Sequence, residues 1–228
     1  MKLALIGCSG LVGDVILKVL DEFSINISEI ILVASKKSVG KKIFFRNKNI
    51  AIISIEDALT KNPEIAIFAA GNLVSEKWVQ KFANKGTTVI DNSSFWRMKN
   101  KIPLVIPEVN ANILKRSNKI ISNPNCSTIQ LVIALNKIHQ EFKLKRLIIS
   151  TYQSVTGTGI KALRQMENER KGLESEKIYP HPIDLNCFPH AGDFLKNGYT
   201  TEEIKLIEET QKIFNDNNIK ITATVVRI

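Results

Sequence analysis

The sequence predicts an α/β fold whose first part is a doubly wound, Rossmann-type domain, and two observations carry this prediction. Short apolar runs of the kind found in buried strands alternate with segments of helical periodicity. The first of these runs ends in a glycine-rich turn that opens a helix. Because right-handed crossovers place helices on both faces of a parallel sheet, this alternation indicates a doubly wound domain.

The elements of this first part can be assigned in order along the chain. Apolar residues recur at helical spacing directly after the glycines, at positions 12, 15, 16, 19 and 20, and a second helical stretch runs from about 74 to 83. The apolar runs that predict strands are residues 2–6, 30–34, 50–53, 65–70 and 87–91.

The regular alternation of apolar runs and helical segments changes near residue 125, which predicts two domains, residues 1–125 and 126–228. The second reads as an α+β domain. It has expected helices at 127–142, 161–171 and 201–214, a strand at 147–152, a turn at Gly157 and Gly159, and a β-rich end from 219 to 228. An unpaired β-rich end predicts aggregation of the isolated chain.

Composition and charge disfavour two classes of protein, nucleic-acid-binding modules and membrane proteins. The 228 residues include 32 basic and 22 acidic side chains, for a net charge of +10, but the lysines are scattered and aromatic residues are only 7%. A basic nucleic-acid-binding module is therefore the last-ranked alternative. No apolar run approaches the roughly 20 residues that span a bilayer, so no membrane partner is expected. Three widely spaced cysteines favour a cytoplasmic location, and we predict no metal site.

The glycine turn Gly7-Cys8-Ser9-Gly10-Leu11-Val12-Gly13 has the placement of a dinucleotide-binding loop. Glycines allow a tight turn and a close approach of the backbone to a pyrophosphate, whose charge is met by the helix N-terminus. The alternative is a tight strand–helix turn without a ligand. The second predicted strand ends in the segment Ala34-Ser35-Lys36-Lys37-Ser38, where an NAD site usually has an acidic residue. Ser35, Lys37 and Ser38 are the expected cofactor contacts in this segment. Lysines and serines suit a 2′-phosphate, which favours NADP over NAD, although a solvated lysine-rich turn is the competing interpretation.

Cys126 begins an expected helix after Asn125. A helix N-terminus stabilises a thiolate, which makes a cysteine reactive, and Asn125 with the first free N–H groups would suit an oxyanion. Cys8 and Cys187 are interpreted instead as small buried apolar residues.

Several further segments carry a resemblance to a known family: residues 34–40, 91–98, 103–110, 123–128, 151–159, 197–200 and 209–213. Together with the glycine loop, and in this order, they resemble the aspartate-semialdehyde dehydrogenase family. The resemblance runs from residue 1 to residue 228. It implies an NADP-dependent, phosphorylating aldehyde dehydrogenase that interconverts L-4-aspartyl phosphate and L-aspartate 4-semialdehyde, as a homodimer, in lysine, threonine and methionine biosynthesis.

The resemblance also implies roles for individual residues. Cys126 matches the nucleophile that forms a thioester, and Gln153 matches the residue that orients the substrate. Arg97 and Lys212 match phosphate-binding cations, Glu209 the carboxylate for the substrate's amino group, and Arg227 the arginine for its carboxylate. The expected cofactor-binding residues are Gly7, Ser9, Gly10, Leu11, Val12, Gly13, Ser35, Lys37, Ser38, Gly71, Ser154 and Gly157.

Alternatives remain for several of these positions. Glu209 with Lys205 and Lys212 would also fit an exposed salt-bridge row on a helix, and Arg227 would fit a solubilising residue on an edge strand. His139, His181 and His190 do not match the family's general base, which the resemblance places a few residues beyond Arg227. The second domain is therefore expected to be incomplete, and a truncated or degenerate family member that at most binds nucleotide is the main alternative function.

Overall fold

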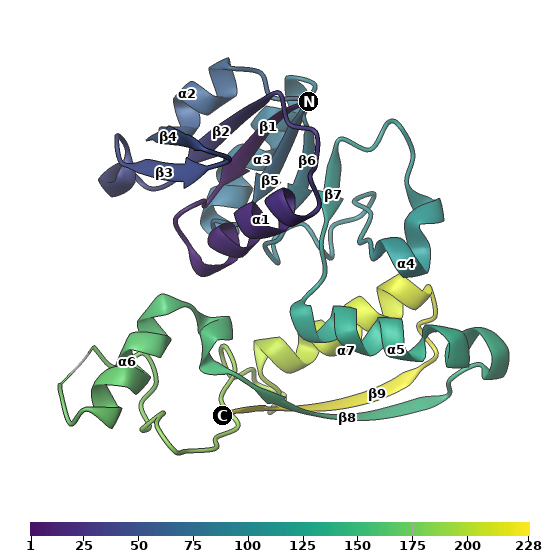
Figure 1. Cartoon of the computed structure of the whole chain (residues 1–228). Coiled ribbons are helices and arrows are strands. Elements are labelled where there is room, and N and C mark those ends of the chain that lie inside the picture. Colours follow the sequence, from purple (N-terminus) through teal and green to yellow (C-terminus); the bar gives the residue numbers. More distant parts are fainter. Residues whose placement is uncertain (175) are drawn as a thin grey trace. The chain divides into compact units, whose positions relative to one another are not determined.

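The computed structural model describes residues 1–174 and 176–228 and divides into two compact units, Met1–Pro124 and Asn125–Ile228 (Figure 1). The division expected from the sequence, between residues 125 and 126, lies one residue further along the chain. Each unit has its own apolar clusters, so each is described by itself.

The first unit is built on a seven-stranded sheet with the order β3-β4-β2-β1-β5-β6-β7. β1 lies in the middle and pairs in parallel with β2 and β5, with Leu5 opposite Leu32 and Ile67. The strands are β1 (Lys2–Ile6), β2 (Glu29–Val33), β3 (Lys42–Phe45), β4 (Lys48–Ile53), β5 (Ile65–Phe68), β6 (Thr88–Asp91) and β7 (Ile120–Ser122). The doubly wound prediction is confirmed for this unit.

Helices cover both faces of this sheet, as Figure 1 shows. α1 (Leu11–Glu22) packs through Leu17 on the face that carries Leu5 and Leu32. α2 (Ile55–Thr60) and α3 (Asn72–Asn84) pack on the opposite face, where Phe82 contacts the cluster of alternate strand residues. A shorter helix, α4 (Pro107–Asn110), precedes β7. Alternation of side chains along each strand supplies both apolar faces.

Two strands of the sheet do not follow from the apolar runs. β3 pairs antiparallel with β4 through a turn at Arg46 and Asn47, both at positive φ, so the otherwise parallel sheet ends in one antiparallel pair at this edge. β3 has only one buried side chain, Phe45, and therefore carries little hydrophobic signal. β7 is three residues long and shorter than the runs that predict a strand.

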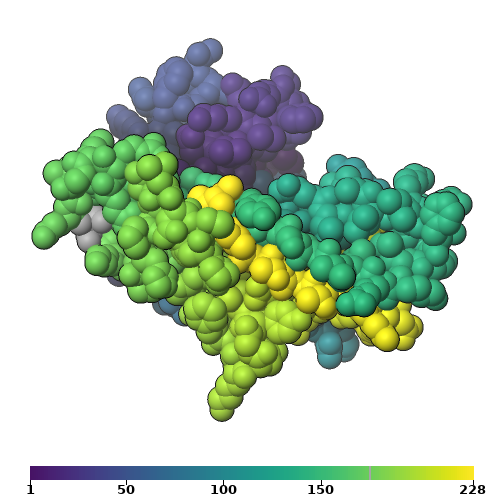
Figure 2. All heavy atoms as spheres, turned by 90° about the horizontal axis from the view of Figure 1, so that it is seen from below, coloured from purple at the N-terminus to yellow at the C-terminus, as the bar shows by residue number. Residues whose placement is uncertain are grey.

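The second unit has two helices on one face of a two-stranded parallel sheet. α5 (Cys126–Phe142) and α7 (Thr201–Phe214) cover β8 (Arg146–Gln153) and β9 (Lys220–Arg227), and α6 (Ile160–Arg170) lies in the long connection. Leu206 of α7 packs against Ile149, Ala223 and Val225 from the strands. The other face is open: Ile148 and Tyr152 are exposed, and Figure 2 shows the C-terminal segment (yellow) at the surface.

Candidate active site

The first unit has a cavity of about 430 Å³ beside the turn that joins β1 to α1. Its lining comes from the carboxyl ends of β1, β2 and β5, which meet at one edge of the sheet, and from the segments that follow β2 and β4. This is the edge at which doubly wound sheets bind ligands. Gly7, Ser9, Gly10 and Ser35 line it, whereas Leu11, Val12, Gly13, Lys37, Ser38 and Gly71 are not among its lining residues.

Two glycines of the turn are required by packing. Gly7 has φ +98°, and a Cβ there would lie 2.4 Å from the carbonyl oxygen of Ala69. A Cβ on Gly13 would lie 2.2 Å from the carbonyl oxygen of Gly7, so α1 begins too close to the turn for any side chain. Gly10 differs, because its nearest neighbour would be 3.5 Å away. As the N-cap of α1 without a side-chain cap, Gly10 leaves the first N–H groups of the helix for another acceptor.

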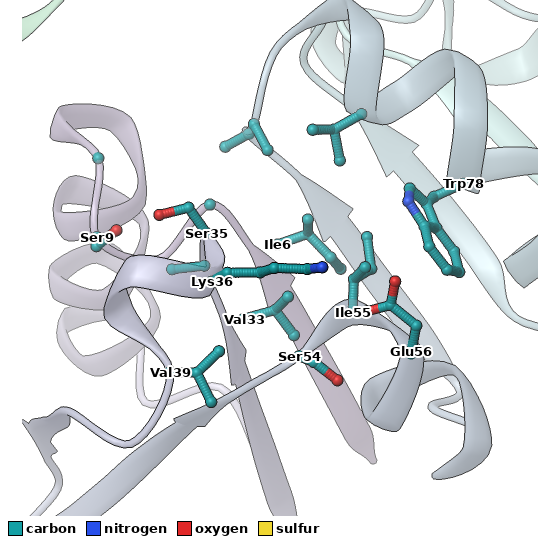
Figure 3. Close-up of a pocket in the computed structure, with 16 residues that line it drawn as sticks. Ile6, Ser9, Val33, Ser35, Lys36, Val39, Ser54, Ile55, Glu56 and Trp78 are labelled. Atoms are coloured by element: carbon teal, nitrogen blue, oxygen red, sulfur yellow. The ribbon is translucent and has the colours of Figure 1, made fainter.

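Lys36, rather than Lys37, reaches into this cavity. Figure 3 shows its side chain extending from the segment after β2 across the cavity, with Glu56 and Trp78 on the far side. Lys36 and Lys37 both lie in a short 3-10 turn, Lys36–Ser38, and the turn decides which of the two faces inward. The sequence pattern cannot distinguish two adjacent lysines. It therefore predicted a positive charge after β2 but not which lysine side chain enters the cavity.

Arg97 is buried in the first unit, in the segment after β6. Its Nε donates to the carbonyl oxygen of Asn123 at 2.9 Å, and its Nη2 donates to the carbonyl oxygen of Asn92 at 2.8 Å. These bonds hold the guanidinium in one orientation, which suits a group that recognises an anion by geometry.

Cys126 is the first residue of α5 and is exposed. Asn125 is the N-cap: its Oδ1 accepts from the Ser127 N–H at 3.0 Å and lies 3.9 Å from the Cys126 Sγ. Its Nδ2 donates to Glu202, so the amide nitrogen does not face the thiol as an oxyanion donor there would. Cys8 is buried as expected, but Cys187 is exposed, and the prediction of a buried Cys187 is wrong. Its apolar neighbour Phe188 turns inward in its place.

A second cavity, of about 510 Å³, lies within the second unit at the start of α5. Cys126, Gln153 and Arg227 all line it, as do Ser154 and Gly157. Arg227 Nη1 donates to Gln153 Oε1 at 3.0 Å, and Gln153 Nε2 donates to Ser127 Oγ at 2.7 Å. Since the oxygen of Gln153 accepts from a guanidinium, its amide orientation is determined, and its N–H₂ group faces the start of α5.

Arg227 is only 4% exposed, so its interpretation as a solubilising edge residue is wrong. It also donates to the carbonyl oxygen of Ser154, while its buried Nε has no hydrogen-bond partner among the described residues. Gly157 lies against it, because a Cβ there would be 2.9 Å from Nη1. A buried guanidinium with an unused donor at a cavity wall is suited to an anionic ligand.

Glu209 is also buried, at 1% exposure, which excludes the exposed salt-bridge row. Its Oε2 accepts from the backbone N–H of Asn125 at 2.7 Å, directly before the cysteine. Lys205 pairs instead with Glu202, at 3.0 Å. Burial lowers the pKa of Lys212, an effect that the nearby Glu209 carboxylate partly opposes.

None of the three histidines lines either cavity. His139 stacks on Phe214 with ring centroids 4.5 Å apart, and its Nδ1 accepts from the Leu144 N–H. His190 packs against Tyr179, and His181 is exposed. In residues 1–174 and 176–228, no group of three His, Cys, Asp or Glu side chains is placed to hold a metal ion. No helix of the same residues has the length and apolar character to cross a membrane.

Comparison with known proteins agrees with this architecture. Residues 2–117 match the family described as "Semialdehyde dehydrogenase, NAD binding domain", and residues 135–228 match "Semialdehyde dehydrogenase, dimerisation domain". Aspartate-semialdehyde dehydrogenase of Aquifex aeolicus is 44% identical over 236 aligned residues, which cover 100% of this chain and 69% of that protein. The chain belongs to the aspartate-semialdehyde dehydrogenase family.

Solved structures of aspartate-semialdehyde dehydrogenases show the same fold. The crystal structure of aspartate semialdehyde dehydrogenase II from Vibrio cholerae is 39% identical and superimposes with a TM-score of 0.92, covering 100% of this chain and 70% of that one. A second crystal structure of that enzyme, complexed with ASA, gives a TM-score of 0.91 over 99% of this chain and 69% of that one, at 39% identity. The resemblance inferred from the motifs is thereby confirmed.

Proposed function

We propose that the chain is an NADP-dependent aspartate-semialdehyde dehydrogenase that interconverts L-aspartate 4-semialdehyde and L-4-aspartyl phosphate through a thioester on Cys126. One observation carries this proposal: Cys126 is exposed at a helix N-terminus in the same cavity as the oriented amide of Gln153 and the buried guanidinium of Arg227. The residues proposed as nucleophile, orienting amide and anion-binding group therefore line the same cavity.

In the oxidative direction, the Cys126 Sγ attacks the aldehyde carbon, a C–S bond forms, and the aldehyde oxygen takes up a proton to give a thiohemiacetal. When bound, NADP would supply the nicotinamide ring that accepts the hydride in this direction. Loss of hydride and of the hydroxyl proton leaves a thioester on Cys126. A phosphate oxygen then attacks the acyl carbon, the C–S bond breaks, and aspartyl phosphate leaves. The biosynthetic reaction is the reverse, and the thioester preserves acyl activation throughout.

The chain's own residues hold the reactants. Arg227, which lines the second cavity, binds the α-carboxylate of the substrate, and Gln153 orients the substrate through its amide. Glu209 binds the amino group. Arg97, fixed by two carbonyl oxygens, and Lys212 are the proposed phosphate-binding cations.

The first cavity is the proposed NADP site. Gly10 leaves the N–H groups at the start of α1 without a side-chain cap, and these suit a pyrophosphate. The side chain of Lys36 extends across the cavity from the segment that also carries Ser35, and its positive charge would suit a 2′-phosphate. Leu11, Val12, Gly13, Lys37, Ser38, Gly71, Ser154 and Gly157 remain proposed contacts of the same cofactor.

The same proposal includes the cellular location, the pathway and the partners of the chain. The chain acts in the cytoplasm, in lysine, threonine and methionine biosynthesis, and pairs with a second copy of itself. Residues 135–228, which match a dimerisation domain, support the homodimer. Nucleic acid is not a proposed partner, because each cavity is lined for a small molecule.

The second candidate is a catalytically impaired family member that at most binds nucleotide. It is favoured by the histidines, none of which lines either cavity. A general base typically contributes about 10²–10⁴-fold to a rate, so a site without one turns over slowly.

The deciding experiment supplies the purified chain with aspartate semialdehyde, NADP and phosphate, and follows NADPH formation while intact-mass spectrometry searches for an acyl adduct. The proposal predicts NADPH and an adduct that maps to Cys126, both abolished in Cys126→Ser and retained in Cys187→Ser. Binding of NADP without adduct or turnover identifies the impaired member. Undiminished turnover by Cys126→Ser contradicts the mechanism.

A further inference from the structure

We propose that Glu202 is a positioning residue for Cys126 and acts through the side-chain amide of Asn125. The inference rests on the proposed role of Cys126 as the nucleophile. It concerns a residue that neither the apolar periodicity nor the cysteine motif singles out, because Glu202 is 76 residues from Cys126 in the chain and enters the site only through α7.

The contact between the two segments is direct. Asn125 Nδ2 donates to Glu202 Oε1 at 2.5 Å. The side chain of Glu202 is only 12% exposed, and its carboxylate also pairs with Lys205 at 3.0 Å. Asn125 is itself buried, so this hydrogen bond is shielded from competing water.

This bond determines which way the Asn125 amide points. A carboxylate only accepts hydrogen bonds, so the nitrogen of the amide faces Glu202 and its oxygen faces α5. That oxygen accepts from the Ser127 N–H at 3.0 Å and lies 3.9 Å from the Cys126 Sγ. Glu202 thus holds the N-cap of the helix whose first residue is the cysteine.

α7 holds Asn125 at two points. Glu202 and Glu209 are seven residues, or two helical turns, apart and so lie on the same face of α7. Glu202 binds the side chain of Asn125, and Glu209 accepts from its backbone N–H at 2.7 Å. A shift of α7 or loss of either carboxylate therefore acts directly on the residue before Cys126.

The test is a double-mutant cycle in a Cys187→Ser background. Its readout is the rate at which iodoacetamide alkylates Cys126, and peptide mass spectrometry confirms that the modified residue is Cys126. Glu202→Ala leaves the amide of Asn125 free to turn away from Ser127 and Cys126, so the N-cap of α5 and the thiol beside it are held less well. We expect alkylation about fivefold slower at neutral pH, the effect of losing a typical N-cap. In Asn125→Ser, which retains a good N-cap but has no amide for Glu202, Glu202→Ala should change the rate no further.

Two variants separate positioning from charge. Glu202→Gln keeps an amide oxygen that accepts from Asn125 Nδ2, and its rate should stay within about twofold of the parent. Glu208→Ala removes an exposed carboxylate from the same helix and should have no effect. Any of three results overturns the inference. Glu202→Ala could slow alkylation equally in both backgrounds, Glu202→Gln could slow it as much as Glu202→Ala does, or Glu202→Ala could leave the rate unchanged.

The alkylation cycle reports on the thiol independently of turnover. If the coupling appears but no acyl adduct forms from aspartate semialdehyde, the positioning of Cys126 stands and the proposed reaction fails. If the adduct forms but Glu202→Ala has the parent's alkylation rate, the reaction stands and Glu202 is not a positioning residue.

Discussion

Cys8 and Cys126 are the same residue type in opposite surroundings. Cys8 follows β1, and its side chain packs with Leu5 and Leu17 under α1, where burial raises the pKa of its thiol from 9.0 to about 11. Cys126 is exposed at the beginning of α5. Desolvation disfavours a thiolate at the first position, whereas the second is open to a reactant.

The buried thiol of Cys8 predicts a loss of stability at alkaline pH. The thiol stays protonated in the folded chain up to about pH 11 but ionises near pH 9 in the unfolded chain. Stability is therefore intact below pH 9 and falls between pH 9 and 11, by about 3 kcal/mol. Urea unfolding at a series of pH values measures this loss.

Cys8→Ala is the matched variant for this prediction. It should remove that part of the pH dependence, whereas Cys187→Ala, at an exposed thiol, should keep it. A Cys8→Ala chain that loses as much stability as the parent between pH 9 and 11 contradicts the assignment to Cys8.

Lys36 gives a prediction for cofactor choice. Because Lys36 lines the first cavity and Lys37 does not, Lys36→Ala should weaken NADP binding about tenfold or more and leave NAD binding nearly unchanged. Trp78 lines the same cavity, so quenching of tryptophan fluorescence can follow the titration.

Lys37→Ala is the control, since it removes the same charge one residue away. We expect it to change NADP affinity by less than about threefold, the effect of an exposed charge. If Lys37→Ala carries the loss instead, the residue implied by the family resemblance is the phosphate contact and Lys36 is not.

At the scale of elements, the glycine turn joins β1 to α1 with almost no free space. Gly7 and Gly13 must be glycine, because a Cβ at either position would lie less than 2.5 Å from a backbone oxygen. The same turn places the N-terminus of α1 at the cavity. Packing and ligand binding thus depend on the same few residues.

Gly13→Ala tests this close approach. Alanine normally favours a helix, but here its Cβ would overlap the Gly7 carbonyl oxygen, and we expect a loss of about 2 kcal/mol in the free energy of unfolding. Gly10→Ala has room for its Cβ and should cost about 1 kcal/mol or less. Equal stabilities of the two variants in urea unfolding would show that α1 can shift away from the turn.

At the scale of the whole molecule, the chain comprises two compact units with separate apolar clusters. All seven strands of the large sheet lie in residues 1–124, as do α1, α2 and α3 on its two faces. Among the described residues of the second unit, the sheet consists of β8 and β9, and α5 and α7 pack on it.

A fragment of residues 1–124 should therefore fold on its own. We expect a single cooperative thermal transition by circular dichroism and binding of NADP, because both the core and the first cavity are complete within it. Phe82→Ala in the fragment should cost about 3–5 kcal/mol, as for other buried phenylalanines. A fragment that melts without cooperativity contradicts this prediction.

Most of the fold could be predicted from the sequence because buried parallel strands appear in it as continuous apolar runs. Residues 2–6 and 30–34 became β1 and β2, and the apolar residues after the glycines became α1. β3 was missed because an edge strand needs few buried side chains, and β7 because three residues carry no periodicity.

What the sequence by itself determined is the family and the Rossmann-type fold, and it also predicted the segments of the candidate site, because these depend on local patterns and contiguous motifs. Only the tertiary structure decided that Lys36 rather than Lys37 enters the cavity, that Glu209 and Arg227 are buried, that Cys187 is exposed and that Glu202 holds Asn125. These outcomes depend on which side of a turn or helix faces a distant segment, and side-chain direction of that kind is set by packing rather than by neighbours in the chain.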